Sequence, residues 1–220
     1  MIGKAARKEA DEHIRAWGTE LGDDAWRLLD KYVADVLQYN RRTNITAAKD
    51  ADTILRRHVV DGLAPAAAMK ARINAPHPRL LDVGAGAGFT GFGMKISWPE
   101  ADVTLMESSY RKFCFLNLAS ANLGLRGLHV VQERAGQNTP GGYDAVLARA
   151  VAPLPDAAAL TLGLARPGGL AVVYQSEEPQ LNEVLSESLD NAGGTLSDRV
   201  PYRLPGETSD RFLAIFRRNE

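Results

Sequence analysis

The chain has 220 residues, 45% of them hydrophobic, and a formal net charge of −1. This length and apolar content suffice for a folded domain with a substantial core. The near-zero net charge excludes binding to nucleic acid through a global positive field, so any such contact requires a local basic patch.

The cysteine content and the N-terminal segment indicate the cellular location. The single cysteine, Cys114, excludes an internal disulfide, and no group of cysteines and histidines has metal-ligand spacing. The segment Met1–Glu12 is charged and lacks the apolar region of a signal peptide, and no apolar run approaches the ~18 residues of a membrane span. We therefore expect a cytoplasmic protein with no metal and no membrane contact.

The N-terminal third is predicted to be helical. Apolar residues in Asp23–Asn40 recur at helical spacing, as in an amphipathic helix. A second helix is predicted over about Asp52–Pro65, with its final proline as a point where it bends, and two further prolines mark a linker. We therefore expect a helical appendage at residues 1–75 and a second domain at residues 76–220.

The second domain alternates short apolar strands with helix-length segments. The expected strands are Leu80–Val83, Val103–Glu107, Leu128–Gln132, Ala145–Ala148 and Leu170–Tyr174, and the expected helices between them include Ser109–Asn122 and Asp156–Ala165. Such alternation predicts a parallel sheet covered by helices on both faces. The tail Arg203–Arg218 is predicted to close the sheet with an antiparallel pair.

A glycine-rich turn follows the first predicted strand. It reads Gly84-Ala85-Gly86-Ala87-Gly88, with Asp82 two residues before its first glycine. Glycines allow positive φ and let a ligand approach the backbone, and the helix that follows starts with free N–H groups. In a doubly wound sheet this turn faces the ligand crevice. The turn therefore predicts a nucleoside cofactor site.

Two cofactors are compatible with this turn. The segment Gly86–Gly91 fits the dinucleotide pattern G-x-G-x-x-G, with Glu107 at the distance expected for a ribose contact, which leaves an NAD-dependent oxidoreductase as an alternative. Asp82 favours S-adenosyl-L-methionine, because a carboxylate attracts its ammonium and sulfonium groups and repels a pyrophosphate. Glu107 can accept both ribose hydroxyls of either cofactor; otherwise it lies beside a helix cap at Ser108 or Ser109.

Three further segments accompany the glycine loop: Tyr39–Thr46, Arg57–Leu63 and Tyr143–Ala152. In this order they resemble the bacterial RsmG (GidB) family, whose members are 16S rRNA guanine-N7 methyltransferases. The resemblance implies an α/β class I S-adenosylmethionine-dependent methyltransferase (Rossmann-like) fold, with a seven-stranded, mostly parallel sheet and an N-terminal helical appendage. It also implies 16S rRNA or the small ribosomal subunit as the partner of a protein that we expect to be a monomer.

Cofactor-binding residues follow from both arguments. The resemblance implies contacts at Gly84, Phe89, Ala135, Gly136 and Arg149, and the residue pattern adds Asp82, Gly86, Gly88 and Glu107. Phe89 is expected beside the cofactor, and its alternative is a buried core aromatic. Arg149 ends an apolar strand, so its charge requires a partner or a crevice.

Basic residues gather upstream of the glycine loop. Between Arg41 and Arg72 there are seven basic residues and three aspartates. Arginines hold phosphates by charge and by bidentate hydrogen bonds. A solvated helix face is the alternative, and the resemblance favours RNA. The expected RNA-binding residues are Arg41, Arg42, Asn44, Arg56, Arg57 and His58.

No catalytic acid or base is expected. Guanine N7 carries a lone pair and no proton, so alignment and electrostatics must supply the catalysis. His58 is expected to make a structural hydrogen bond, with Asp61 as the candidate partner.

Four residues depart from the family pattern that the chain resembles. Thr90 stands where proline is usual, Glu107 replaces an aspartate, Gly136 a glutamate and Gln175 a lysine. At Gly136 the backbone N–H is expected to remain available to the cofactor. The departures leave open a divergent RNA-binding relative with another RNA target or with lost activity.

Overall fold

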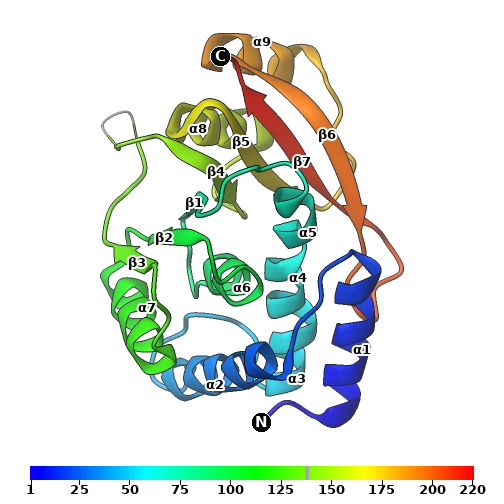
Figure 1. Ribbon diagram of the computed structural model, residues 1–220, viewed down its shortest axis with the longest axis vertical. Helices are drawn as coiled ribbons and strands as arrows, with labels where there is room; N and C mark the ends of the chain where they lie inside the picture. Colours follow the sequence, from blue (N-terminus) through cyan, green and yellow to red (C-terminus); the bar gives the residue numbers. More distant parts are fainter. Residues whose placement is uncertain (137–138) are drawn as a thin grey trace.

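A seven-stranded sheet organises the molecule, whose computed structural model describes residues 1–136 and 139–220 (Figure 1). The strands are β1 (Arg79–Val83), β2 (Asp102–Met106), β3 (Leu128–Val131), β4 (Tyr143–Ala148), β5 (Ala165–Gln175), β6 (Gly194–Tyr202) and β7 (Arg211–Arg218). Their order in the sheet is β3-β2-β1-β4-β5-β7-β6. β1 to β5 pair in parallel, β7 runs antiparallel to β5, and β6 runs antiparallel to β7. The predicted α/β fold is confirmed.

The strand order reverses at β1, which pairs with β2 on one side and β4 on the other. Central strands such as β1 and β4 are buried over most of their length and mostly apolar, because helices cover both of their faces. At such a reversal the connections leave in opposite directions and open a crevice at the carboxyl ends of the strands.

Helices cover the two faces of the sheet. They are α1 (Lys4–Ala16), α2 (Asp23–Asn40), α3 (Ala51–Ile54), the π-helical segment η1 (Leu55–Val59), α4 (Val60–Leu63), α5 (Pro65–Lys70), α6 (Phe89–Ser97), α7 (Tyr110–Leu123), α8 (Leu154–Leu164) and α9 (Glu183–Ala192). Residues of α1 to α7 share one buried cluster with one face of the sheet, and α8 and α9 pack on the other face. Figure 1 shows α8 and α9 at the opposite end of the view from α2 and α3. Within the described residues, no helix has the length and apolar character needed to cross a membrane.

The N-terminal helices and the sheet share a single core. Ile14 of α1 and Leu29 of α2 belong to the same buried cluster as Leu80 of β1. α4 crosses α6 so closely that a Cβ placed on Gly62 would lie 2.2 Å from the backbone oxygen of Phe89. The division into an appendage and a second domain at residue 75 stays a prediction.

Several element boundaries differ from those expected. The predicted helix Asp52–Pro65 is a series of short helices that continues to Lys70, because Pro65 occupies the first turn of α5, where proline is tolerated. The predicted helix Asp156–Ala165 begins at Leu154 and ends at Leu164, since Ala165 already belongs to β5.

Three elements give weak sequence signals. The first arm of the predicted C-terminal pair is β6, which ends at Tyr202, before the tail that was expected to contain it. β6 is an edge strand with polar residues and Pro201, and such strands lack a continuous apolar run. α1 and α9 were not expected, because they bury only a few apolar side chains, three in α1 and two in α9.

Candidate functional site

The expected cofactor residues lie at the carboxyl ends of neighbouring strands. Val83 of β1 pairs with Met106 of β2 and with Ala148 of β4. The next residue along each strand is Gly84, Glu107 or Arg149. The sheet register therefore brings together residues that are more than twenty positions apart, at the edge where the crevice opens.

The glycine loop has the shape of a ligand cradle. Gly84 and Gly86 have φ of +65° and +62°, a region that side chains with a Cβ rarely adopt. A Cβ on Gly86 would meet, among the described residues, only the oxygen of Gly84 at 3.8 Å. A Cβ on Gly84 would instead lie 2.6 Å from Cγ1 of Val151. Gly86 leaves room for a ligand, whereas Gly84 makes room for the chain that follows β4.

Gly88 and Gly91 allow neighbouring side chains to pack closely against the backbone. A Cβ on Gly88, whose φ is +83°, would lie 2.6 Å from the ring of Phe92. A Cβ on Gly91 would lie 2.7 Å from Leu105. The third glycine of the dinucleotide-like pattern is therefore explained by the contact between α6 and the sheet.

The carboxylates of Asp82 and Glu107 accept hydrogen bonds from backbone N–H groups in and next to the glycine loop. Asp82 Oδ2 accepts a hydrogen bond from the backbone N of Gly91 at 2.8 Å, and burial raises the pKa of Asp82 to about 7. Glu107 Oε2 accepts from Gly86 N at 2.9 Å and Oε1 from Ser109 N at 2.7 Å. Each carboxylate oxygen has a second lone pair, so the bracing bonds of Glu107 leave acceptor capacity for ribose hydroxyls.

Phe89 lies in a stack of side chains from three elements. It is 4% exposed, the His58 ring is stacked on it at 4.8 Å, and the Arg149 guanidinium lies 5.4 Å from its centroid. A cation over an aromatic face is attracted by the ring quadrupole. Burial, followed by the charge of Arg149, lowers the pKa of His58, so the neutral imidazole is favoured.

The prediction of a hydrogen bond between His58 and Asp61 is wrong. His58 Nε2 lies 3.3 Å from Thr46 Oγ1. Asp61 instead accepts from Arg149 Nη1 at 2.9 Å and from the Tyr202 hydroxyl at 2.7 Å. The π-helical turn of η1 comes just before Asp61, and such single-turn insertions occur often at functional sites.

The carboxylate of Asp61 is the centre of a buried charge network. Its side chain is 5% exposed, and Arg211 Nη1 also lies 3.9 Å away. We call Asp61, Arg149, Tyr202 and Arg211 the Asp61 cluster. The cluster ties α4, β6 and β7 to the chain after β4, and so supplies the partner that the charge of Arg149 was expected to require. Tyr202 was missed, because a tyrosine on a weakly patterned edge strand carries no sequence signal.

The segment after β3 corrects one expectation. The backbone N–H of Gly136 donates to Thr139 Oγ1 at 3.1 Å, and the Thr139 hydroxyl donates to Glu133 at 2.8 Å. The N–H of Gly136 is therefore engaged inside its own loop, where it was expected to remain available. Ala135 packs partly buried against the cluster that contains Val83.

Two other departures from the family pattern have defined places in the structure. Thr90 is buried in the first turn of α6. Gln175, at the end of β5, donates from Nε2 to the backbone oxygen of Tyr174 at 2.7 Å.

The expected RNA-binding residues fall into two groups. Arg41, Arg42, Asn44 and Arg57 are exposed, and His58 is half-buried in the stack described above. Arg56 pairs with Glu9 of α1 at 2.7 Å and lies 3.9 Å from Asp52. The charge of Arg56 is therefore shared with carboxylates of its own chain.

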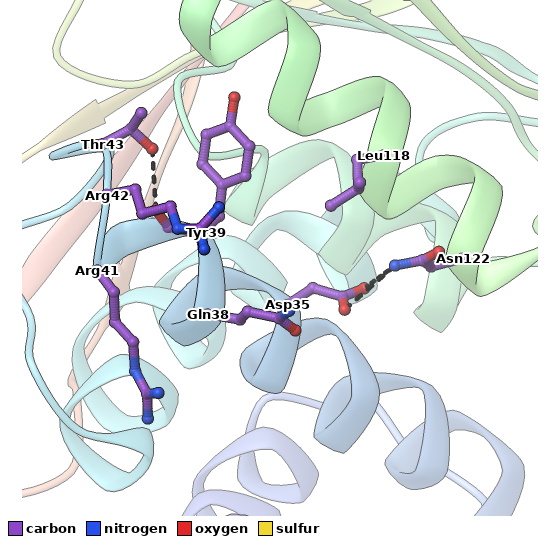
Figure 2. A pocket seen from close by; sticks show the side chains of 8 residues that line it. All are labelled: Asp35, Gln38, Tyr39, Arg41, Arg42, Thr43, Leu118 and Asn122. Carbon is purple, nitrogen blue, oxygen red and sulfur yellow. Dashed lines mark hydrogen bonds between the residues drawn. The ribbon is translucent and has the colours of Figure 1, made fainter.

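A cavity of about 490 Å³ lies between α2 and α7 (Figure 2). Tyr39, Arg41 and Arg42 line it from α2 and the loop that follows, and Leu118 and Asn122 line it from α7. A second cavity of about 250 Å³ is lined by Arg42, Thr43, Asn44, Ile45, Ser109, Arg111 and Lys112.

Sequence reasoning missed Arg111 and Lys112. Both lie in the first turn of α7, and cations at a helix N-terminus oppose the helix dipole. This unfavourable placement of two cations is the sequence signal by which Arg111 and Lys112 could have been recognised.

Comparison with known proteins identifies the family. The family described as rRNA small subunit methyltransferase G matches residues 26–192. Two ribosomal RNA small subunit methyltransferase G proteins are similar over most of their length: that of Myxococcus xanthus is 32% identical, covering 92% of each chain, and that of Rubrobacter xylanophilus is 35% identical, covering 97% of this chain and 84% of the relative.

The solved structures agree with the fold. Magnesium protoporphyrin IX methyltransferase from Synechocystis, with bound SAM, has a TM-score of 0.61 at 16% identity and covers 90% of this chain and 98% of its own. At this identity the likeness concerns the fold alone. The sequence relatives go further, and together with the family match they show that the chain belongs to the rRNA small subunit methyltransferase G family.

Proposed function

We propose that the protein transfers a methyl group from S-adenosyl-L-methionine to N7 of a guanosine in 16S rRNA of the small ribosomal subunit. The observation that carries the proposal is the meeting of the glycine loop, Glu107 and Arg149 at the switch point of the sheet, in a chain of this family. Three of the similar solved structures are titled with bound SAM, SAH or S-adenosyl-L-methionine, which supports this choice of cofactor over NAD.

The residues present suit this cofactor. The open space above Gly86 admits a ligand to the backbone, and Glu107 retains acceptor capacity for a ribose. Phe89, Ala135, Gly136 and Arg149 surround the same strand ends, with Gly136 contributing through its place in the loop rather than through its N–H. When bound, the cofactor supplies an electrophilic methyl group on a sulfonium.

The chain's part in the reaction is to position its two substrates. N7 of guanine attacks through a lone pair and loses no proton, so no general base is required and alignment supplies the rate. The environment of His58 supports the absence of a general base. Its imidazole lies between Thr46 and the Phe89 ring, where it orients these two side chains.

The exposed cations Arg41, Arg42 and Arg57, together with Asn44, are the proposed RNA contacts on this chain. Arg56 contributes indirectly, because its pair with Glu9 fixes α1 against η1. We further propose that the protein acts as a cytoplasmic monomer; light scattering during gel filtration tests the monomer, and a mass of twice 23.8 kDa would contradict it.

Methyl incorporation tests the function. The protein is incubated with tritiated S-adenosylmethionine and either small subunits or deproteinised 16S rRNA, and large-subunit RNA is the control. Borohydride and aniline cleavage of the product then maps 7-methylguanosine. Label confined to 16S rRNA and cleavage at one guanosine are expected. Absence of label with either substrate, from a protein that binds the RNA, would favour the relative with lost activity.

A calorimetric titration tests the cofactor independently of RNA. S-adenosylmethionine is expected to bind and NAD is not. A Gly86→Val variant is expected to abolish binding, since a side chain there would fill the open cradle at a positive φ. The matched control is Gly124→Val at the end of α7, which carries the same φ cost at +63° and whose Cβ meets no described atom within 4 Å.

A further inference from the structure

We propose that the surface between the C-terminal end of α2 and α7 is a binding groove for an unpaired segment of RNA, with a cationic half that holds phosphates and an aromatic half that holds a base. We call it the α2–α7 groove, and define it by Tyr39, Arg42, Asn44, Arg111, Lys112 and Leu118. The inference rests on the proposed function, because it states how that function's RNA substrate is held.

Two adjoining cavities form the groove. The cavity of about 490 Å³ contains Tyr39 and Leu118, and the cavity of about 250 Å³ contains Arg111 and Lys112. Arg42 and Thr43 line both of them, so the two cavities lie on either side of the same short segment. A flexible chain that carries alternating bases and phosphates can occupy both cavities at once.

The cationic half has charge without an internal partner. In residues 1–136 and 139–220, the ion pairs include no contact of Arg42, Arg111 or Lys112 with a carboxylate. Arg111 and Lys112 also stand in the first turn of a 14-residue helix, where the dipole disfavours cations. A phosphate placed there is attracted both by the side chains and by the helix terminus.

The aromatic half combines a held tyrosine ring with an exposed leucine and a polar pair. The Tyr39 ring packs on Phe115 at 5.1 Å, and its hydroxyl donates to the backbone oxygen of Arg111 at 3.1 Å. Leu118 is 45% exposed on the facing wall. In Figure 2, Tyr39 and Leu118 border the same space, and Asp35 and Asn122 close its other end through a hydrogen bond of 3.2 Å. A fixed ring offers a stacking surface for a base, and the polar pair offers hydrogen bonds to its edge.

The groove leads to the cofactor crevice. Ser109, which lines the smaller cavity, donates its backbone N–H to the carboxylate of Glu107, the residue that also holds the glycine loop. An RNA segment in the groove therefore lies next to the loop that the proposed function assigns to the cofactor. Its base in the aromatic half is a neighbour of the methylated guanosine and not the guanosine itself.

Fluorescence anisotropy with a labelled single-stranded RNA of about ten nucleotides tests the groove. The double variant Arg42→Ala/Lys112→Ala is expected to bind more weakly and to lower the slope of log affinity against log salt by about 0.7 for each lost phosphate contact. The matched control is Arg126→Ala, an exposed arginine beyond the opposite end of α7, which is expected to keep the wild-type slope.

The aromatic half has its own variants. Tyr39→Leu is expected to weaken binding by about 5- to 150-fold through lost stacking, whereas Tyr39→Phe keeps the ring and stays within about twofold of wild type. Since Tyr39 also packs on Phe115, Leu118→Glu provides a second test at an exposed position. Its control is Val184→Glu, which adds the same charge on exposed α9. Thermal unfolding confirms that each variant is folded.

The outcomes separate this inference from the proposed function. If folded groove variants bind the RNA as wild type does, or if Arg126→Ala and Val184→Glu weaken it equally, the groove is overturned even when wild type methylates 16S rRNA. If wild type methylates no RNA while the groove variants still lose RNA affinity, the groove stands and the proposed function fails.

Discussion

In the Asp61 cluster, Arg149 and Arg211 approach a carboxylate that is 5% exposed, whereas in the α2–α7 groove Arg42, Arg111 and Lys112 make no ion pair within the described chain. Burying a charge is costly unless it is paired and hydrogen-bonded. The cluster therefore fixes the geometry beside the glycine loop, and the groove leaves its cations free for an anionic partner. Arginine therefore stabilises the fold in the Asp61 cluster, whereas in the α2–α7 groove it is available to bind an anionic partner.

The strongest test of this contrast removes the centre of the cluster. Asp61→Ala leaves Arg149 and Arg211 without their shared carboxylate, and we expect a loss of about 3 kcal/mol in the free energy of unfolding, measured by urea denaturation. Asp24→Ala breaks an exposed pair with Arg27 and should cost less than about 0.5 kcal/mol. Equal losses in the free energy of unfolding for the two variants would show that the buried, paired charges matter no more to stability than the exposed ones.

The backbone next to the cluster gives the second test. Gly62→Ala forces a Cβ to within 2.2 Å of the oxygen of Phe89, and separating α4 from α6 should cost about 2 kcal/mol and weaken S-adenosylmethionine binding. Gly163→Ala, whose Cβ meets no atom of the described residues within 4 Å, is the control and should be neutral or slightly stabilising. Unfolding curves and calorimetry report the two effects, and an unchanged Gly62→Ala protein would show that the crossing tolerates displacement.

A pH series probes the buried carboxylate beneath the loop. Burial raises the pKa of Asp82 to about 7, above the value of about 3.9 in an unfolded chain. The stability that its protonated form contributes is present in full below about pH 4 and is lost as the pH rises through about 7. Asp82→Asn cannot lose a proton, so it should gain stability relative to wild type across that window. A difference between the two proteins that stays constant with pH would contradict the assignment.

The smallest expected effect on stability belongs to the exposed arginines. Arg41→Ala/Arg42→Ala should change the free energy of unfolding by less than about 0.5 kcal/mol and leave S-adenosylmethionine affinity intact. Affinity for 16S rRNA should fall, and fall less steeply with salt than in wild type. A parallel loss of cofactor affinity would mean that the two regions are not independent.

Sequence reasoning located the sheet, and it placed the expected cofactor residues after neighbouring strands, because those signals are local. A strand that ends in glycines, and apolar strands alternating with helices, fix the position of Gly84, Glu107 and Arg149 at one edge. The hydrogen bonds of Asp61 and Gly136 were not predictable in this way. The partners of Asp61 lie 88 and 141 residues away, and the bond of Gly136 depends on how its own loop closes.

The sequence by itself therefore determined the α/β class, the glycine loop and the basic segment around Arg41, since periodicity, glycine placement and charge are properties of short stretches. Only the tertiary structure decided which charges are neutralised. It pairs Arg149 with Asp61 and Arg56 with Glu9, and it brings Arg111 and Arg42 to the same cavity. The reason is physical: pairing and burial depend on distances between segments that the chain order leaves free, and the packing of α1 to α7 on the sheet sets them.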